Sequence, residues 1–195
     1  MKLGLKLSLG FAVSTVFLIV VVIFSIFNLN KLNDSVQILS FDCYPKTVWS
    51  HNVIEGIYEA SEAIKNIMLT NDDSEIDRNK KHLDEIKQLV SNSLDSLKKV
   101  LTFGKGKELL DNVLTARKEY MNNREKLFSL VNSKEIEQAK TTLFGNMRSS
   151  QNEYIVAINN LIQYQDERFI NASIEGDEIY HSSFLIQIII AIISL

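Results

Sequence analysis

The chain has 195 residues, of which 24 are acidic and 21 basic, and its formal net charge is −3. This mild acidity argues against a nucleic-acid-binding surface, which would show a basic stripe, so no nucleic-acid partner is expected. A single cysteine, Cys43, excludes an intrachain disulfide and a cysteine-based metal site. We interpret Cys43 as a small apolar residue in a helix seam, and pairing with the Cys43 of a symmetric copy is the alternative.

The first expected element is an apolar segment that runs from Leu7 to Phe27 without a charge. About twenty apolar residues, at roughly 1.5 Å rise each, span a bilayer core, so 7–28 is predicted to be a transmembrane helix. The segment is longer than the core of a signal peptide and lacks a small-x-small cleavage site before Asn28, which favours a permanent anchor. Because Lys2 and Lys6 precede it, residues 1–6 are expected in the cytoplasm and the next domain outside.

Residues 29–181 are predicted to form one helical domain, in which 24 acidic and 19 basic residues give a net charge of about −5. Polar breaks at 71–74, 102–106 and 132–133 divide it, and Ser133 is the expected N-cap of the helix that follows the third break. The expected helices are therefore about 29–71, 74–102, 106–132 and 134–181. Pro45 is expected to bend the first of them.

Each predicted helix carries one apolar stripe at heptad spacing; the second runs from Leu83 to Leu101, and the fourth begins with Ile136 and Ala139. Such stripes are buried against one another, and short connections make neighbouring helices antiparallel. The sequence therefore predicts an all-α fold, an antiparallel up-down-up-down four-helix bundle. The first and fourth helices, at about 65–70 Å against about 40 Å for the inner two, are expected to extend past the bundle towards the membrane.

The fourth helix continues in register into a second apolar segment at 183–195. About a dozen residues are fewer than a full span needs, so we interpret this segment as the beginning of a second transmembrane helix, truncated at Leu195. His181 is expected at the membrane interface. This arrangement favours transmission of a displacement across a membrane, with an output module expected beyond Leu195.

No group of residues in the sequence indicates catalysis. His51, His82 and His181 are isolated, without the spaced partners that a metal site needs. No glycine-rich phosphate loop follows a strand, since no strand is predicted. An enzyme is not expected, and no cofactor or metal is predicted.

Several segments resemble bacterial methyl-accepting chemotaxis receptors with a four-helix-bundle sensor. They are the opening Met1-Lys-Leu-Gly-Leu-Lys-Leu-Ser-Leu-Gly-Phe11, the anchor, and Leu29-Asn-Lys-Leu-Asn-Asp-Ser35. Ile64 to Thr70 with the acidic turn after it looks like that family's first distal hairpin, and Tyr120 to Leu143 is similar to its third-to-fourth helix turn.

The resemblance implies a homodimer, formed through the first helix, in the bacterial plasma membrane with the sensor outside the cytoplasm. It also implies that a ligand displaces the fourth helix and the second transmembrane helix slightly, and that a cytoplasmic output module reads this motion. The same sensor type precedes histidine kinases and diguanylate cyclases, so these remain alternatives, as does a membrane-anchored helical protein-interaction domain.

A ligand site is predicted in the distal half of the bundle. Arg117 and Arg124 are spaced with the apolar stripe, so they flank or enter the core, and counting from the distal turns places Arg148 level with Arg117. Related sensors grip carboxylates with first-helix arginines, whereas Lys65 is the cation available there and lacks the bidentate fork. The partner is expected to be a small molecule or a ligand-loaded binding protein. The hypothesised pocket comprises Tyr58, Glu62, Lys65, Asn66, Arg124, Arg148 and Asn152; the alternative is that these form salt bridges and solvated surface.

Overall fold

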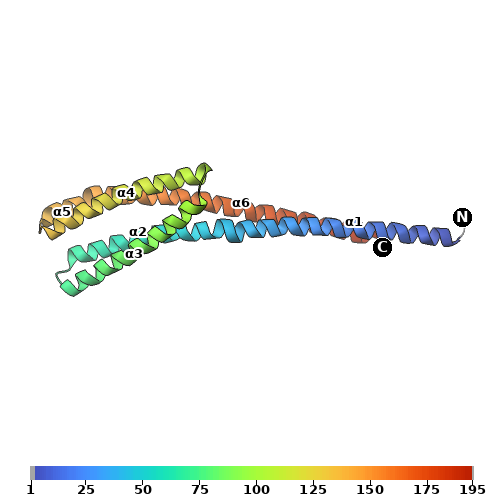
Figure 1. Ribbon diagram of the computed structural model, residues 1–195, viewed down its shortest axis with the longest axis horizontal. Helices are drawn as coiled ribbons and strands as arrows, with labels where there is room; N and C mark the ends of the chain where they lie inside the picture. Colours follow the sequence, from blue (N-terminus) through green and yellow to red (C-terminus); the bar gives the residue numbers. More distant parts are fainter. Residues whose placement is uncertain (1–2, 195) are drawn as a thin grey trace. The chain divides into compact units, whose positions relative to one another are not determined.

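The structure is a computed structural model that describes residues 3–194, and within that range it contains helices and no strand. Its elements in chain order are α1 (Leu3–Gln37), η1 (Ile38–Cys43), α2 (Tyr44–Leu69), α3 (Asp73–Val100), α4 (Gly104–Asn132), α5 (Ile136–Thr142), η2 (Leu143–Met147) and α6 (Arg148–Ser194) (Figure 1). Both η segments are single stretches of π-helix. The chain divides into two compact units, Pro45–Glu167 on one hand and the remaining N- and C-terminal parts on the other.

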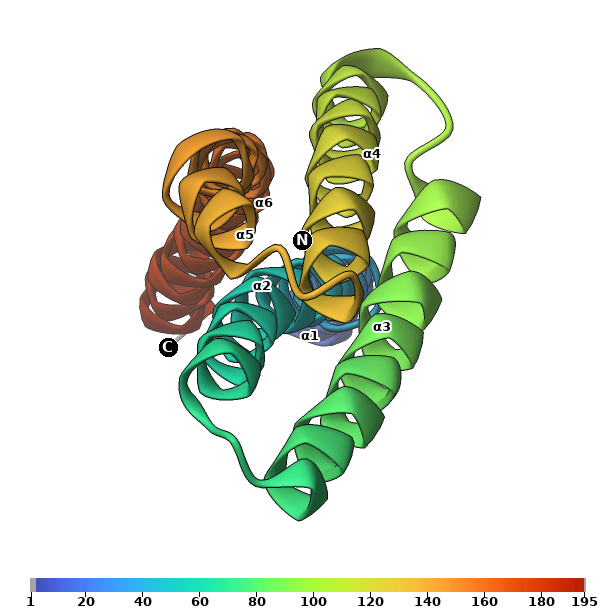
Figure 2. The same cartoon turned by 90° about the vertical axis from the view of Figure 1, so that its left-hand side faces the viewer.

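The unit Pro45–Glu167 is a four-helix bundle, which confirms the predicted all-α fold. Figure 2 looks along it and shows α2, α3, α4 and the α5–α6 segment arranged around a common centre. One hydrophobic cluster draws buried side chains from all of these helices. The stripe predicted for the second helix is buried throughout, in α3 and the residue after it: Leu83, Ile86, Val90, Leu94, Leu97 and Leu101.

The turn between α2 and α3 follows the polar signal in the sequence. Asp72 is the N-cap of α3, and its carboxylate accepts a hydrogen bond from the backbone N–H of Ser74 at 2.9 Å. Acidic Asp73 and Glu75 occupy the first turn of α3, and Lys98 and Lys99 occupy its last turn. Charges placed in this way oppose the partial charges of the helix ends, so α3 is stabilised at both of its termini.

The turn after α4 differs from the prediction, because Ser133 is the C-cap of α4 and not an N-cap. Lys134 adopts a left-handed conformation with φ of 60°. Its N–H donates to the carbonyl of Val131 at 3.0 Å, and the N–H of Glu135 donates to the carbonyl of Leu130 at 2.9 Å. This pair of bonds is a Schellman motif, which satisfies the last carbonyls of α4, so Glu135 stands at the N-cap of α5.

The predicted fourth helix at 134–181 is in fact divided into α5, η2 and α6. The division is at Gly145, whose φ of −98° and ψ of −105° are not helical. Glycine permits these angles because it has no Cβ. Ile136, predicted in the apolar stripe, is 43 % exposed, whereas Ala139 is fully buried. Beyond the division, α6 continues without interruption from Arg148 to Ser194.

Pro45 is accommodated by the π-helical segment that precedes it. Proline has no N–H, and its ring crowds the carbonyl four residues earlier. In η1 the hydrogen bonding is wider than in an α-helix: the N–H of Tyr44 donates to the carbonyl of Leu39, five residues back. The helix therefore passes Pro45 with a local change of pitch and no break. Cys43, at the end of η1, is fully buried.

In the other compact unit, α1 lies antiparallel to the C-terminal part of α6. Arg168 donates to Asp42 of η1 at 3.1 Å, Gly176 lies beside Ser35, and Gln187 donates to Ser25 at 3.5 Å. The residue numbers of the partners fall through η1 and α1 as those in α6 rise, which is the antiparallel order. Among the described residues, one continuous helix, Gly10–Leu69, contains a stretch long and apolar enough to cross a membrane. The predicted second apolar segment is helical as far as Ser194, and Leu195 lies outside the described residues.

Candidate functional site

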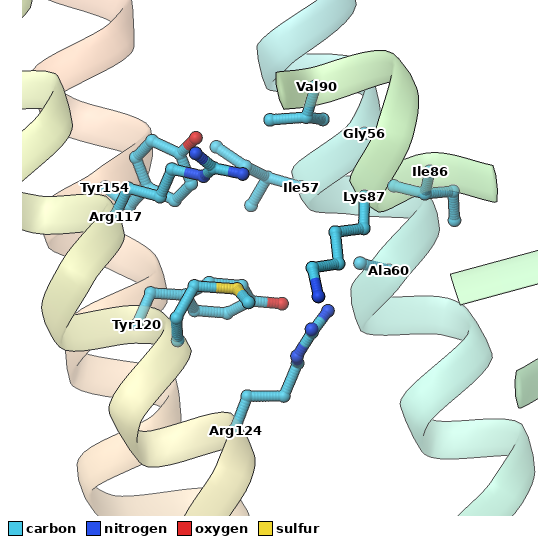
Figure 3. Close-up of a pocket in the computed structure, with 11 residues that line it drawn as sticks. Gly56, Ile57, Ala60, Ile86, Lys87, Val90, Arg117, Tyr120, Arg124 and Tyr154 are labelled. Carbon is cyan, nitrogen blue, oxygen red and sulfur yellow. The ribbon is translucent and has the colours of Figure 1, made fainter. Parts of the chain in front are cut away.

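The bundle unit contains a small cavity of about 30 Å³ between its four helices. This volume has room for about two water molecules and lies well below the usual range for ligand pockets, about 300–1,000 Å³. Exposed Lys87 and half-buried Arg117, Met121 and Arg124 lie at its edge, so it opens between α3 and α4. The lining residues are Gly56, Ile57 and Ala60 of α2, Ile86, Lys87 and Val90 of α3, Arg117, Tyr120, Met121 and Arg124 of α4, and Tyr154 of α6 (Figure 3).

Gly56 brings α2 close to α3 beside the cavity. A Cβ at this position would collide with the Cγ2 methyl of Val90 and lie 3.3 Å from the Cγ2 methyl of Ile86. The two helices can therefore pack at this level only because residue 56 has no side chain. A glycine inside a helix costs about 0.5–1 kcal/mol of stability relative to alanine. The close packing of α2 against α3 offsets this cost to the helix.

Two tyrosines place their hydroxyls inside the bundle. Tyr120 and Tyr154 are 3 % and 2 % exposed, and their ring centroids are 5.8 Å apart. Within residues 3–194, neither hydroxyl has a hydrogen-bond partner. An unsatisfied buried polar group costs about 1–3 kcal/mol, so the two hydroxyls are an unusual pair to find next to a cavity.

Burial also determines the protonation state of both phenols. It raises the pKa of Tyr120 to about 12, and the nearby Arg124 guanidinium opposes this increase. Burial likewise raises the pKa of Tyr154, against the opposing charge of Arg117. Both groups are therefore neutral at physiological pH, and each can donate an O–H to an acceptor in the cavity.

Three cationic side chains reach the cavity, and its lining contains no carboxylate. Arg117 donates to the Ser91 hydroxyl at 2.8 Å, so one neutral contact holds its guanidinium. Figure 3 shows the Lys87 ammonium and the Arg124 guanidinium pointing towards one another, with the Tyr120 hydroxyl facing the same place. In the described part of the chain neither Lys87 nor Arg124 forms a salt bridge. The cavity is thus a concentration of positive charge with hydrogen-bond donors and no internal counter-ion.

Of the seven residues in the predicted pocket, only Arg124 lines this cavity. Arg117, expected to flank or enter the core, lines it as well. The structure does not bring the other six to the cavity; all of them are exposed on the outside of the bundle unit: Tyr58, Glu62, Lys65, Asn66, Arg148 and Asn152. The pocket predicted from those six residues stays a prediction, separate from the cavity.

Sequence reasoning missed Gly56, Lys87, Tyr120 and Tyr154 as site residues. Both tyrosines lie at the heptad spacing of the apolar stripes in the sequence, which accounts for their rings but not for their hydroxyls. A signal was present in α4, where Arg117, Tyr120 and Arg124 recur at helical spacing on one face. Three polar groups on a buried face indicate either an internal network or a binding site. No group of three or more metal-ligating side chains is found among the residues described.

Comparison with known proteins agrees with this architecture. Among curated proteins none matches the chain. A family model described as a four helix bundle sensory module for signal transduction matches residues 1–176, which include α1, the whole bundle and much of α6. The chain therefore belongs to the family of four-helix-bundle sensory modules for signal transduction.

Proposed function

We propose that this chain is the ligand-sensing input module of a transmembrane chemoreceptor, with its bundle outside the cytoplasm. A ligand in the bundle displaces α6, and the apolar end of α6 carries the displacement through the membrane to a cytoplasmic output module. One observation carries the proposal: α6 is a single helix from Arg148 to Ser194, with Tyr154 in the cavity wall and the second apolar segment at its C-terminal end. A displacement of α6 at the bundle can therefore reach the membrane through this one helix.

The membrane end of α6 provides a test that needs no ligand. Tyr180 and Phe184 stack with ring centroids 6.2 Å apart at the start of the apolar segment. Aromatic rings favour the membrane interface, so this pair is expected to fix the depth of α6 in the bilayer. Residues 1–195 are joined in helical register to the rest of the second transmembrane helix and the output module of a chemoreceptor, so that the second span is complete. Kinase activity is measured in isolated membranes.

Replacing both rings, Tyr180→Ala with Phe184→Ala, is expected to shift kinase activity in the absence of ligand, because the end of α6 settles at a new depth. Ile188→Leu, on the same apolar segment, is the control and should leave the activity unchanged. If the double variant inserts normally and its kinase activity equals that of the parent hybrid, transmission through α6 is ruled out.

The proposal includes a homodimer formed along the first helix. Two large side chains on α2, Tyr58 and Leu69, are 54 % and 83 % exposed, which supports an unfilled contact surface on this helix. A Tyr58→Cys chain with Cys43→Ser is expected to form a disulfide-linked dimer on oxidation in membranes. A monomeric mass in detergent together with no crosslink would contradict the dimer.

A further inference from the structure

The small cavity of the bundle is lined by a cluster of hydrogen-bond donors that lack an acceptor. The Lys87 ammonium of α3 and the Arg124 guanidinium of α4 point towards one another there, and the Tyr120 hydroxyl faces the same place (Figure 3). Tyr120 is 3 % exposed, and its hydroxyl has no partner among the described residues. Two facing cations repel one another. An anion between them would remove this repulsion and accept hydrogen bonds from all three groups.

The size of the cavity decides which anion can occupy it. About 30 Å³ is room for about two water molecules. A polyatomic anion such as phosphate, sulfate or a carboxylate-bearing molecule occupies more than that. A monatomic halide is only slightly larger than a water molecule, so it fits. It also suits donors that come from different helices, because a spherical ion accepts hydrogen bonds from any direction.

The chemistry of the lining favours a halide over water. A buried water molecule makes about three hydrogen bonds and uses both donors and acceptors around it. Within the described part of the chain, the lining offers cations and hydroxyl donors but no carboxylate. The walls from α2 and α3, formed by Ile57, Ile86 and Val90, are apolar and add no side-chain acceptor. An ion that only accepts hydrogen bonds therefore matches this cluster better than water does.

We propose that the cavity binds one halide ion, held by the Lys87 ammonium, the Arg124 guanidinium and the Tyr120 hydroxyl. The ion ties α3 to α4, because its two cationic partners come from these two helices. The inference goes beyond the sensory function proposed above and does not depend on it. A bound halide stabilises the bundle whether or not α6 transmits a displacement.

Tyr154 provides an internal control for the position of the ion. Its hydroxyl also lies in the cavity wall without a partner in the described chain. Figure 3 shows this hydroxyl on the side of Arg117, away from the head groups of Lys87 and Arg124. Removal of the Tyr154 hydroxyl therefore takes the same atom type from the same cavity but leaves the donors of the ion in place.

The test is thermal melting of the full chain in a non-ionic detergent while sodium gluconate is replaced by sodium chloride at constant ionic strength. Gluconate is too large for the cavity, and the constant ionic strength keeps the screening of surface charges unchanged. Because an ion that binds only the folded chain stabilises it, saturating chloride is expected to raise Tm by about 2–4 °C. The NMR signal of chloride is expected to broaden when the chain is added, which reports binding directly.

Three variants locate the ion. Arg124→Gln is expected to lose the chloride-dependent increase in Tm, and Tyr120→Phe is expected to reduce it. Tyr154→Phe is the matched control and should retain the full increase. Salts also act on Tm through the whole protein surface, but that effect is common to all three variants and cancels in the comparison.

Circular dichroism of each variant verifies that the helices are intact, and Tyr120→Phe keeps the test decisive if Arg124→Gln is unfolded. Equal Tm in chloride and gluconate, or an unbroadened chloride signal, would mean that the cavity contains water alone and would overturn the proposal. A chloride-dependent increase that Arg124→Gln and Tyr120→Phe both retain in full would also overturn it. So would a decrease of that increase in Tyr154→Phe as large as in Tyr120→Phe.

Discussion

Gly56→Ala is expected to destabilise the bundle, although alanine is the better helix former. The new Cβ would collide with the Cγ2 methyl of Val90 and come within 3.3 Å of Ile86 Cγ2. Valine is stiff at χ1 in a helix, so its methyl cannot turn aside. The collision must be relieved by moving α2 away from α3.

The size of the effect is a difference between two terms. Overpacking a well-packed core costs about 1–3 kcal/mol, and the change from glycine to alanine inside a helix returns about 1 kcal/mol. We therefore expect a net loss of about 1 kcal/mol. In a protein of this size that loss corresponds to a decrease in Tm of about 2–4 °C.

Thermal melting of the full chain in detergent, followed by far-UV circular dichroism, measures this change. Gly176→Ala is the control, because its Cβ would meet Ser35 Cβ at an ordinary 3.4 Å, and it should raise Tm by about 2–4 °C. In a Val90→Ala background the obstructing methyl is gone, so Gly56→Ala should there be neutral or stabilising. A higher Tm for Gly56→Ala alone, or an equal effect in both backgrounds, would refute the reasoning.

Three further predictions concern single groups. Tyr120→Phe removes an unpartnered buried hydroxyl, so without ligand it should raise stability by about 1 kcal/mol. Burial raises the pKa of Tyr120 to about 12 from an ordinary 10, so the stability contributed by this group should be full below pH 10 and decrease towards pH 12. Melting curves recorded at increasing pH should therefore show a shallower decrease in Tm for Tyr120→Phe than for the native chain. Parallel curves for the two chains would contradict the raised pKa. Lys134→Gly should raise Tm by about 2–4 °C, since Lys134 occupies a left-handed position with φ of 60°, and a lower Tm would contradict the Schellman turn.

The bundle could be predicted because its information is local and repeated. The stripe from Leu83 to Leu101 in α3 has one period and one polar face, and the acidic turn at Asp72 gives an unambiguous start signal. The details that were wrong depend on backbone geometry. Ser133 is suited by type to either end of a helix, and the Schellman bonds around Lys134 decide which end it occupies.

The candidate site could be predicted only in part, because it depends on alignment between distant helices. Residue counting placed Arg148 level with Arg117, and the actual neighbour of Arg117 on the fourth helix is Tyr154. The turn at Ser133 to Glu135 and the π-helical η2 around Gly145 displace the count along α6. Neither irregularity follows from heptad spacing, whereas Arg117 and Arg124 were placed correctly because they share the uninterrupted α4.

The lining of the cavity is drawn from α2, α3, α4 and α6. A change in the distance between any two of these helices therefore changes the shape of the cavity, and a change in its contents acts on all four. The cavity is for this reason a place where the spacing of the whole bundle can be altered by a single substitution.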